Sequence, residues 1–190
     1  MKTVKESGPY KLLGHSFGGI VAYEMARMLL DEGEKIESLI LLDSIPPSTL
    51  QEDIDYDESS LLVNACVGIA EQQGVRIDPE RFKNLPTTNQ ESFVGDVFSK
   101  SGLNINLEQF SLFFRIFQAN QLSYNKYQQK PLVSELNVLL IRAGQEENSI
   151  KAYPQDFGWD SYLMRPALVH DIEATHFSML EQKHIHLTTQ

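Results

Sequence analysis

Gly14-His15-Ser16-Phe17-Gly18-Gly19 is the stretch that decides the fold of this chain, because it carries the pattern G-x-S-x-G in an informative setting. A short apolar run at residues 10–13 precedes it, and a long helical pattern at residues 17–30 follows it. At a sharp turn from strand to helix, a serine is held in a strained backbone and its hydroxyl projects beyond the end of the sheet. The stretch therefore predicts that Ser16 is a nucleophile.

The residues around Ser16 are expected to complete the turn. Glycines are expected on both sides because neighbouring backbone would collide with a Cβ atom, and Gly18 and Gly19 would also let the helix start close to the strand. The backbone N–H of Phe17 is expected to point to the same place as the hydroxyl, at the positive end of the helix dipole. Phe17 is therefore a candidate oxyanion donor, and the sequence names no second one.

The next elements predict a parallel sheet. Gly33 lies where the helix should end in a left-handed backbone. Residues 36–42 read as a strand, because they lead into a continuous apolar run at residues 39–42 that ends at Asp43, which is typical of a buried parallel strand. Strand, helix and strand make one right-handed βαβ unit. Further strands are expected at residues 137–142 and 167–172, so the fold class is α/β with a mostly parallel sheet.

The middle of the chain predicts helices instead. No strong strand pattern occurs between Ser48 and Lys130, and helices are expected near 60–73, 79–84, 90–100 and 107–127. We therefore expect one domain over residues 1–190, in which residues 48–130 form a helical insertion. After His176, a last helix is expected to run from Phe177 to about His184.

Composition excludes several classes of protein. The net charge is −10, and no basic stripe is present, so a nucleic-acid partner is not expected. Cys66 is the single cysteine, which rules out an intrachain disulfide framework and fits a reducing, cytoplasmic location. Its apolar neighbours favour a position in the core. Neither a signal peptide nor an apolar run of about 20 residues is visible, so no membrane span is expected. No metal cluster or phosphate-binding loop is seen, and we expect no cofactor.

Three side chains are candidates for a catalytic triad. A serine hydroxyl needs a base within hydrogen-bond reach, and that base needs an acid to orient it. Ser16 follows the first strand, Asp43 the second and His176 the last, so all three fall at the carboxyl ends of parallel strands. The order Ser, Asp, His is the one expected of α/β-hydrolases. Glu146 or Glu147, after the third strand, is the rival acid.

The other histidines fit the role of base less well. His15 lies inside the turn and is expected to pack or to cap. His170 lies within a strand, while His184 and His186 lie late in a helix or tail. Only His176 comes just after a strand ends, so it is the predicted base.

These motifs resemble the thioesterase domains of nonribosomal peptide synthetases and polyketide synthases. Residues 12–26 resemble the turn and helix of that family, and residues 41–47, which include Asp43 and a double proline, resemble its acid-bearing strand end. The step of 27 residues from Ser16 to Asp43 is similar to that family's and favours Asp43 as the acid. Residues 157–159 and 176–180 resemble the end of the domain, and Gly18-Gly19 with Phe17 lean toward the integrated type of domain over the stand-alone type.

The resemblance implies an activity and a partner. An acyl or peptidyl chain would arrive as a thioester on the phosphopantetheine of a carrier domain, pass to Ser16, and leave by hydrolysis or by cyclisation. The helical insertion at 48–130 would form a lid over an acyl channel. Two other functions stay open: a carboxylesterase or lipase acting on simple esters, and a catalytically impaired fragment that keeps a partner-binding surface.

The resemblance also implies strands before the turn. That family's domain begins several strands earlier, whereas nine residues precede Tyr10 here, so we expect an α/β-hydrolase fold whose N-terminal strands are absent. Those strands would carry the second oxyanion donor, and loss of one such donor costs on the order of 10²–10³ in kcat. An apolar sheet edge would also be left unpaired. We therefore expect the isolated chain to be weakly active and prone to self-association.

Overall fold

The computed structural model describes residues 3, 5–51, 67, 70, 75–100, 107–144 and 153–181. The chain divides into two compact units. The first, here called the α/β unit, combines Met1–Glu52 with Tyr127–Gln190, and the second, the helical unit, is Asp53–Lys126. The helical unit falls within the insertion expected at 48–130, and the role of that insertion as a lid stays a prediction.

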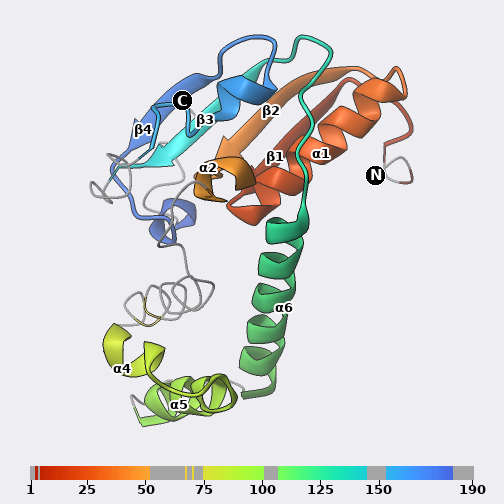
Figure 1. Ribbon diagram of the computed structural model, residues 1–190. Coiled ribbons are helices and arrows are strands. Elements are labelled where there is room, and N and C mark those ends of the chain that lie inside the picture. Colours follow the sequence, from red (N-terminus) through yellow and green to blue (C-terminus); the bar gives the residue numbers. More distant parts are fainter. Residues whose placement is uncertain are drawn as a thin grey trace. The chain divides into compact units, whose positions relative to one another are not determined.

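The α/β unit is built on a sheet of four parallel strands in the order β1-β2-β3-β4 (Figure 1). The strands are β1 (Tyr10–His15), β2 (Ile36–Leu42), β3 (Val138–Ala143) and β4 (Leu168–Ile172). The parallel sheet and the α/β class expected from the apolar runs are thus confirmed. Because every strand runs the same way, the carboxyl ends of all four lie along one edge of the sheet.

Helix α1 (Phe17–Asp31) connects β1 to β2 and packs on one face of the sheet (Figure 1). Its buried residues include Ile20, Tyr23 and Ala26, and the strands contribute Leu39 and Leu41 to the same core. Gly33 has φ +78° and donates its N–H to the carbonyl of Leu30 at 3.0 Å, so the left-handed helix end is confirmed.

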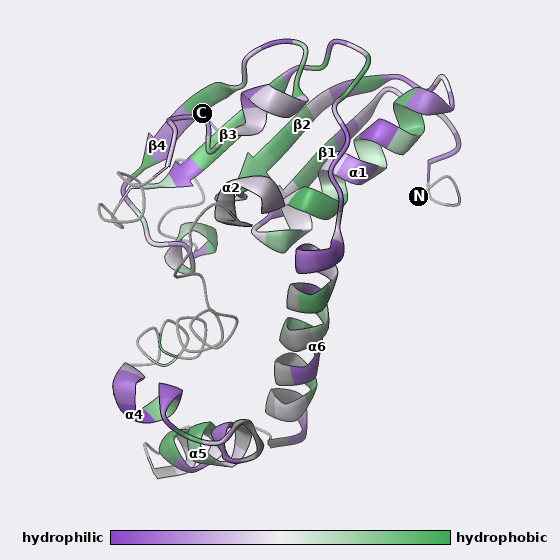
Figure 2. Cartoon of the chain, in the orientation of Figure 1, coloured by the Kyte–Doolittle hydropathy of each residue, from purple (hydrophilic) through white to green (hydrophobic). Residues whose placement is uncertain are grey.

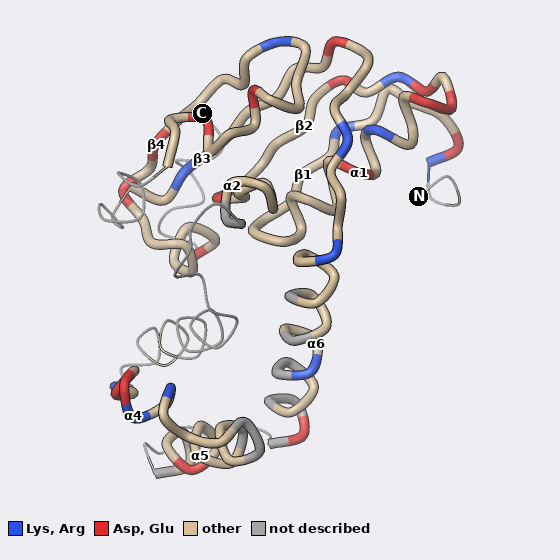
Figure 3. Tube along the Cα trace, in the orientation of Figure 1, with Lys and Arg blue, Asp and Glu red and all other residues tan. Residues whose placement is uncertain are grey.

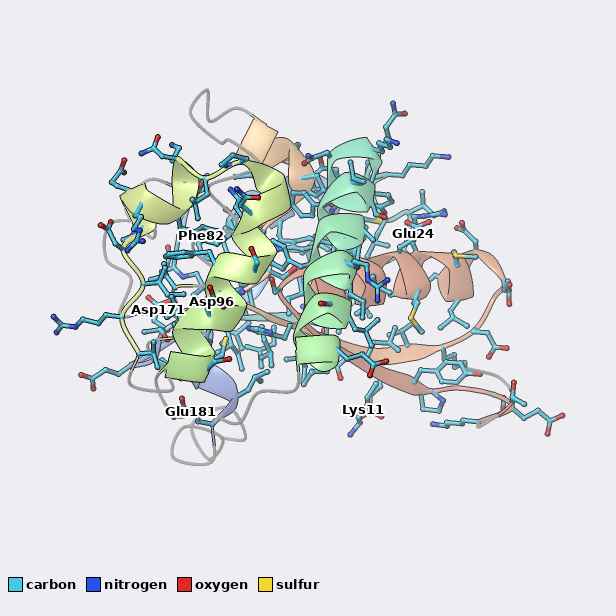
Figure 4. The ribbon with its side chains drawn as sticks, turned by 90° about the horizontal axis from the view of Figure 1, so that it is seen from below. Lys11, Glu24, Phe82, Asp96, Asp171 and Glu181 are labelled. Atoms are coloured by element: carbon cyan, nitrogen blue, oxygen red, sulfur yellow. The ribbon has the colours of Figure 1, made fainter. Side chains whose placement is uncertain are left out.

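Tyr23 ties the later part of the chain to α1. Its side chain is fully buried, and its hydroxyl lies 2.8 Å from the carbonyl oxygen of Lys130 and 3.0 Å from that of Tyr162. The next residue, Glu24 (labelled in Figure 4), accepts a hydrogen bond from the Tyr127 hydroxyl at 2.5 Å. These polar contacts hold the chain against the helix at the point where it returns to the sheet.

Three short elements were not expected, or end earlier than expected. Helix α2 (Pro47–Gln51) begins at a proline, whose fixed φ suits the first turn. A 3₁₀ turn, η1, spans Trp159–Tyr162. Where a helix from Phe177 to His184 was expected, the structure has only a 3₁₀ turn, η2 (Ser178–Leu180), because Glu181 is already extended. The part of that prediction beyond Glu181 lies outside the described residues.

The helical unit contains α4 (Pro79–Lys83), α5 (Thr87–Lys100) and α6 (Leu107–Lys126), which confirms three of the expected helices. Asp78 caps α4 by accepting from the N–H groups of Glu80 and Arg81. Five buried hydrophobic residues form the core of the helical unit: Ala70, Val75, Ile77, Phe82 and Val94. Most of the helix expected at 60–73, and Cys66 with it, lies outside the described residues.

Among the residues that the structure describes, the second face of the sheet carries exposed apolar side chains. Strands β2 and β3 are largely hydrophobic, and in the α/β unit most charged residues lie on α1 and in the connections (Figures 2 and 3). The strand register aligns one apolar residue from each strand in a row across this face: Leu13, Ile40, Leu139 and Leu168. The two outer members are 60% and 71% exposed. Among the described helices, none is long and apolar enough to cross a membrane.

The glycines of the turn differ in whether a Cβ atom would fit at their positions. A Cβ at Gly14 would overlap the backbone of Gly18, and a Cβ at Gly19 would overlap the side chain of Ser44. A Cβ at Gly18 would meet nothing within 4 Å. The expectation that neighbouring backbone excludes a Cβ is therefore right for Gly14 and wrong for Gly18, because Gly18 faces open space at the start of α1.

Gly14 and Gly18 make a matched test of this packing. Gly14→Ala should lower the free energy of unfolding by about 3 kcal/mol or more, because the methyl group has only rigid backbone to displace. Gly18→Ala should leave it unchanged or raise it by up to about 1 kcal/mol, because alanine favours the helix. Denaturant unfolding of both variants measures the difference, and equal losses would contradict the assigned packing.

Candidate active site

Ser16 occupies the turn between β1 and α1 in a strained backbone, with φ 54° and ψ −127°. Its N–H donates to the carbonyl of Leu42 at 2.8 Å, and its own carbonyl accepts from Gly19 at 2.9 Å. A positive φ is uncommon for a residue with a side chain, and such strain gathers at functional sites. Phe17, the candidate oxyanion donor, is the first residue of α1, where N–H groups point out of the helix end.

Asp43 follows β2 directly and also has a positive φ, of 43°. Its N–H donates to the carbonyl of Ile141 at 2.7 Å, which continues the ladder one residue past the strand. One carboxylate oxygen, Oδ1, accepts the N–H of Ala143 at 3.0 Å. The end of the neighbouring strand thus fixes the carboxylate through Oδ1 and leaves its second oxygen, Oδ2, for another partner.

The second oxygen of Asp43 contacts His176. The distance from His176 Nδ1 to Asp43 Oδ2 is 2.6 Å, and the side chains are only 24% and 12% exposed. A carboxylate accepts hydrogen bonds, so Nδ1 carries the hydrogen, and Nε2 is the nitrogen that can take up a proton when the ring is neutral. The structure therefore brings together the predicted base and the predicted acid, which are separated by 133 residues in the sequence.

The loop that carries His176 is held by its own side chains. Thr175 Oγ1 and Ser178 Oγ lie 3.1 Å apart, and each accepts a backbone N–H of the other residue. Met179 is fully buried against residues from three strands and the loop: Leu42, Ile141, Ile172 and Ala174. These local hydrogen bonds favour a turn over a continuing helix. They also fix the backbone that carries the His176 imidazole.

The chain after Asp43 is anchored by the segment around η1. Trp159 is fully buried, and its indole Nε1–H donates to the carbonyl of Ser44 at 2.7 Å. The Thr49 hydroxyl donates to the carbonyl of Phe157 at 2.8 Å. Residues 157–159 resemble the thioesterase domains in sequence, and the structure shows what they do here: they hold the turn that follows the acid.

His15 takes a part in the site that the sequence did not reveal. Its Nε2 lies 2.9 Å from the carbonyl oxygen of His176, and the two imidazole rings are 4.6 Å apart between centroids with a tilt of 34°. Burial lowers the pKa of His15, and the nearby His176 lowers it further. His15 was expected to pack or cap, and its contact with His176 depends on a loop 161 residues away.

The rest of the predicted candidates fall into two groups. His170 is exposed on β4. The rival acids Glu146 and Glu147, together with His184 and His186, lie outside the described residues. Within the parts of the chain that the structure describes, no group of three or more His, Cys, Asp or Glu side chains is arranged to hold a metal ion.

The family of this chain follows from comparison with known proteins. The family model described as the thioesterase domain matches residues 1–189. The chain belongs to the thioesterase-domain family. Its relatives include malpibaldin synthetase of Mortierella alpina, which is 30% identical over 180 residues covering 94% of this chain and 3% of the relative. Vanchrobactin synthetase VabF of Vibrio anguillarum is 45% identical over 101 residues, which cover 50% of this chain and 4% of the relative.

Solved structures show the same fold. A four-domain nonribosomal peptide synthetase, holo-AB3403, matches with a TM-score of 0.79 at 22% identity, covering 100% of this chain and 14% of that one. The Vlm2 thioesterase domain with a bound dodecadepsipeptide matches with a TM-score of 0.65 at 22% identity, covering 100% of this chain and 70% of that one. The fold expected from the motifs, a thioesterase domain of the α/β-hydrolase kind, is confirmed. This thioesterase-family chain spans only a small part of the synthetases that it matches.

The lowered pKa of His15 predicts how stability changes with pH. Because the pKa in the folded state lies below the ordinary value of 6.5, the unfolded chain binds more protons as the pH falls. The contribution of His15 to stability is complete above pH 6.5 and is lost as the pH falls from there toward the lowered pKa. The size of this contribution is set by how much burial, and then the nearby His176, disfavour protonation of His15 in the folded chain.

Chemical denaturation between pH 5 and 8 measures this effect. His15→Gln should remove part of the loss seen in the wild-type chain at low pH, because glutamine does not titrate. His170→Gln is the matched control, since it removes an exposed imidazole of β4, and it should keep the wild-type slope. Identical pH profiles for all three proteins would contradict the prediction.

Proposed function

We propose that the chain is a serine thioesterase that releases an acyl or peptidyl chain from the phosphopantetheine thioester of a carrier domain. The observation that carries the proposal is the 2.6 Å hydrogen bond from His176 to Asp43, at the sheet edge where Ser16 follows β1. Membership of the thioesterase-domain family and relatives that are peptide synthetases support the type of substrate. The carrier domain is thus the proposed partner.

The reaction proceeds through an acyl-enzyme. Ser16 Oγ attacks the thioester carbonyl carbon while its proton passes to Nε2 of His176. The negative charge on the carbonyl oxygen is stabilised by the N–H of Phe17 at the start of α1. The C–S bond then breaks, and the imidazolium returns its proton to the departing thiolate. Acyl-Ser16 is then attacked at its carbonyl carbon by water, or by a nucleophile on the acyl or peptidyl group itself, while the proton of the attacking group passes to Nε2 of His176. The bond from the acyl carbon to Ser16 Oγ breaks, and the imidazolium returns the proton to Oγ.

Asp43 supports the base in two ways. Its hydrogen bond fixes the tautomer of His176 with hydrogen on Nδ1, so that Nε2 can accept the proton of Ser16. Its negative charge stabilises the imidazolium that forms during each step. The N–H of Ala143 holds the carboxylate in place. These contacts support Asp43 as the acid in place of Glu146 or Glu147.

The proposed chemistry uses no metal and no cofactor of the enzyme itself, since the phosphopantetheine arrives with the substrate. The helical unit is the proposed lid over the acyl chain. A cytoplasmic location fits a single cysteine and a carrier domain as partner.

Single substitutions test the triad. Ser16→Ala and His176→Ala should lower kcat/KM for a carrier-bound or N-acetylcysteamine acyl thioester on the order of 10⁴-fold or more. Asp43→Asn should lower it on the order of 10³–10⁴-fold, because an amide favours the wrong tautomer of the base. Ser7→Ala and Asp31→Asn are matched controls at exposed positions and should retain wild-type turnover.

The same proteins separate the competing functions. A fluorophosphonate should label the wild-type chain at Ser16 and leave Ser16→Ala unlabelled, because only an activated serine reacts. Failure to label the wild-type chain would favour the impaired fragment with a partner-binding surface. Faster turnover of p-nitrophenyl esters than of acyl thioesters would favour a carboxylesterase or lipase.

We also propose that the chain self-associates through β1. Among the strands that the structure describes, β1 lies at an edge of the sheet, next to β2 only. Leu13 on this strand is 60% exposed, and Lys11 (labelled in Figure 4) pairs with Glu37 at the surface at 2.9 Å. An edge strand with an exposed apolar side chain is a template for pairing with another strand.

Leu13→Lys tests the association. A second positive charge beside Lys11 should shift the wild-type oligomer toward the monomer, because two copies meeting at this strand would bring like charges together. Lys11→Arg, on the same strand, keeps the charge and should not change the association. Sedimentation velocity over a range of concentrations measures the shift, and a wild-type chain that stays monomeric throughout would rule out the proposal.

A further inference from the structure

We propose that His15 is a positioning residue that fixes the orientation of the His176 imidazole during catalysis. The inference rests on the proposed function, in which His176 is the base. It concerns a residue that takes no part in the bond-making steps described for Ser16, His176 and Asp43. The contacts made by its ring show how it acts.

The first contact fixes the backbone of His176. A carbonyl oxygen can only accept a hydrogen bond, so the 2.9 Å contact requires that Nε2 of His15 carries a hydrogen. The bond joins the end of β1 to the loop after β4, two segments that β2 and β3 separate within the sheet. The loop is thus held relative to the residue next to the nucleophile. A small movement of that loop would otherwise change the distance from the base to Ser16 directly.

The second contact fixes the ring of His176. The His15 ring lies against it at 4.6 Å with a tilt of 34°, and the Phe177 ring approaches it edge-on at 5.1 Å with an angle of 87°. Asp43 holds Nδ1 at the same time. These neighbours restrict rotation of the imidazole about its side-chain bonds, so that Nε2 is oriented before the substrate arrives. Preorganisation of this kind lowers the barrier because less reorganisation is needed during the reaction.

The charge of His15 must suit this position. The titratable groups that face its ring are His176 and Asp43, and the lowered pKa of His15 keeps the ring neutral near pH 7. When His176 accepts the serine proton, a neutral ring beside the new imidazolium offers polarisable contact, whereas a second cation at this distance would repel it. A neutral ring with hydrogen on Nε2 therefore meets both requirements, as a backbone donor and as an uncharged neighbour.

The register of β1 explains why the position next to the nucleophile can do this. Side chains alternate along a strand, so His15 lies on the same face as Leu13, opposite the face that α1 covers. The loop after β4 reaches the site on this side, as the His15 contact itself shows. Two adjacent residues thus have different functions in the proposal: Ser16 is the nucleophile, and His15 positions the base, His176.

Two substitutions separate positioning from simple packing. His15→Phe keeps a ring of similar size without the donor, and His15→Gln places an amide N–H near the position of Nε2 without the ring. If the donor orients the base, His15→Phe should lower kcat roughly 10- to 100-fold with little change in KM. His15→Gln should recover most of that loss. The melting temperature of each variant shows whether folding accounts for the difference.

Nuclear magnetic resonance supplies a readout that does not depend on activity. In the wild-type chain, the imidazole nitrogen shifts of His15 at pH 7 should show a neutral ring with hydrogen on Nε2. The downfield proton of the bond from His176 Nδ1 to Asp43 should be visible in the wild type and in His15→Gln, and should broaden or disappear in His15→Phe because the ring is less restrained. This signal should persist in Ser16→Ala, so it can be followed in a chain that is expected not to turn over.

The outcomes distinguish this inference from the proposed function. Equal turnover by the wild type and Ser16→Ala would reject the proposed function, while the nuclear magnetic resonance signals would still test the role of His15. The inference would be overturned if His15→Phe kept the wild-type kcat, or if the downfield proton were unchanged in His15→Phe. A wild-type His15 ring that carries hydrogen on Nδ1 would overturn it as well. Equal losses in both variants that follow their melting temperatures would also overturn it, because packing alone would then explain them.

Discussion

The hydrogen bond between Asp43 and His176 depends on the parallel alignment of four strands. Asp43 is placed by the ladder that β2 shares with β3, since its N–H bonds to Ile141 and its carboxylate to the N–H of Ala143. His176 is placed by the strand on the other side of β3. A shift of one residue in any of these registers would turn the side chains to the opposite face and separate the pair. The geometry of the Asp43–His176 pair is therefore a property of the sheet as a whole.

Supports outside the sheet hold the loops that carry Asp43 and His176. Trp159 anchors the chain after Asp43 through the carbonyl of Ser44, and Thr175 and Ser178 close the turn that carries His176. His15 joins that turn to the end of β1. All of these bonds involve a backbone group or a short side chain, which leaves little conformational freedom at the site. In the proposed reaction, rigid support of this kind would let the Ser16 hydroxyl meet its base with little reorganisation.

Strain accompanies this arrangement at two positions. Ser16 and Asp43 both have a positive φ, and neither is a glycine. Each stands immediately after a strand, where the chain turns sharply so that a side chain can project past the end of the sheet. The cost of such a backbone is of order 1–3 kcal/mol per residue, and it is offset by burial of α1 and the strands around it. Gly14 and Gly19 make the turn possible by leaving room for Gly18 and Ser44.

The sequence by itself determined the strands, the helix after Ser16 and the identity of the three candidate triad residues. Apolar runs, the glycines of the turn and a polar residue after each strand are local signals, and physical rules convert them directly into elements. The open Cβ position at Gly18 and the end of η2 at Glu181 could not be read in this way, because they depend on what surrounds each residue. Only the tertiary structure decided the contact of His15 with His176 and that of Trp159 with Ser44. Both join segments more than 100 residues apart, and no local pattern encodes which distant backbone carbonyl a side chain will meet.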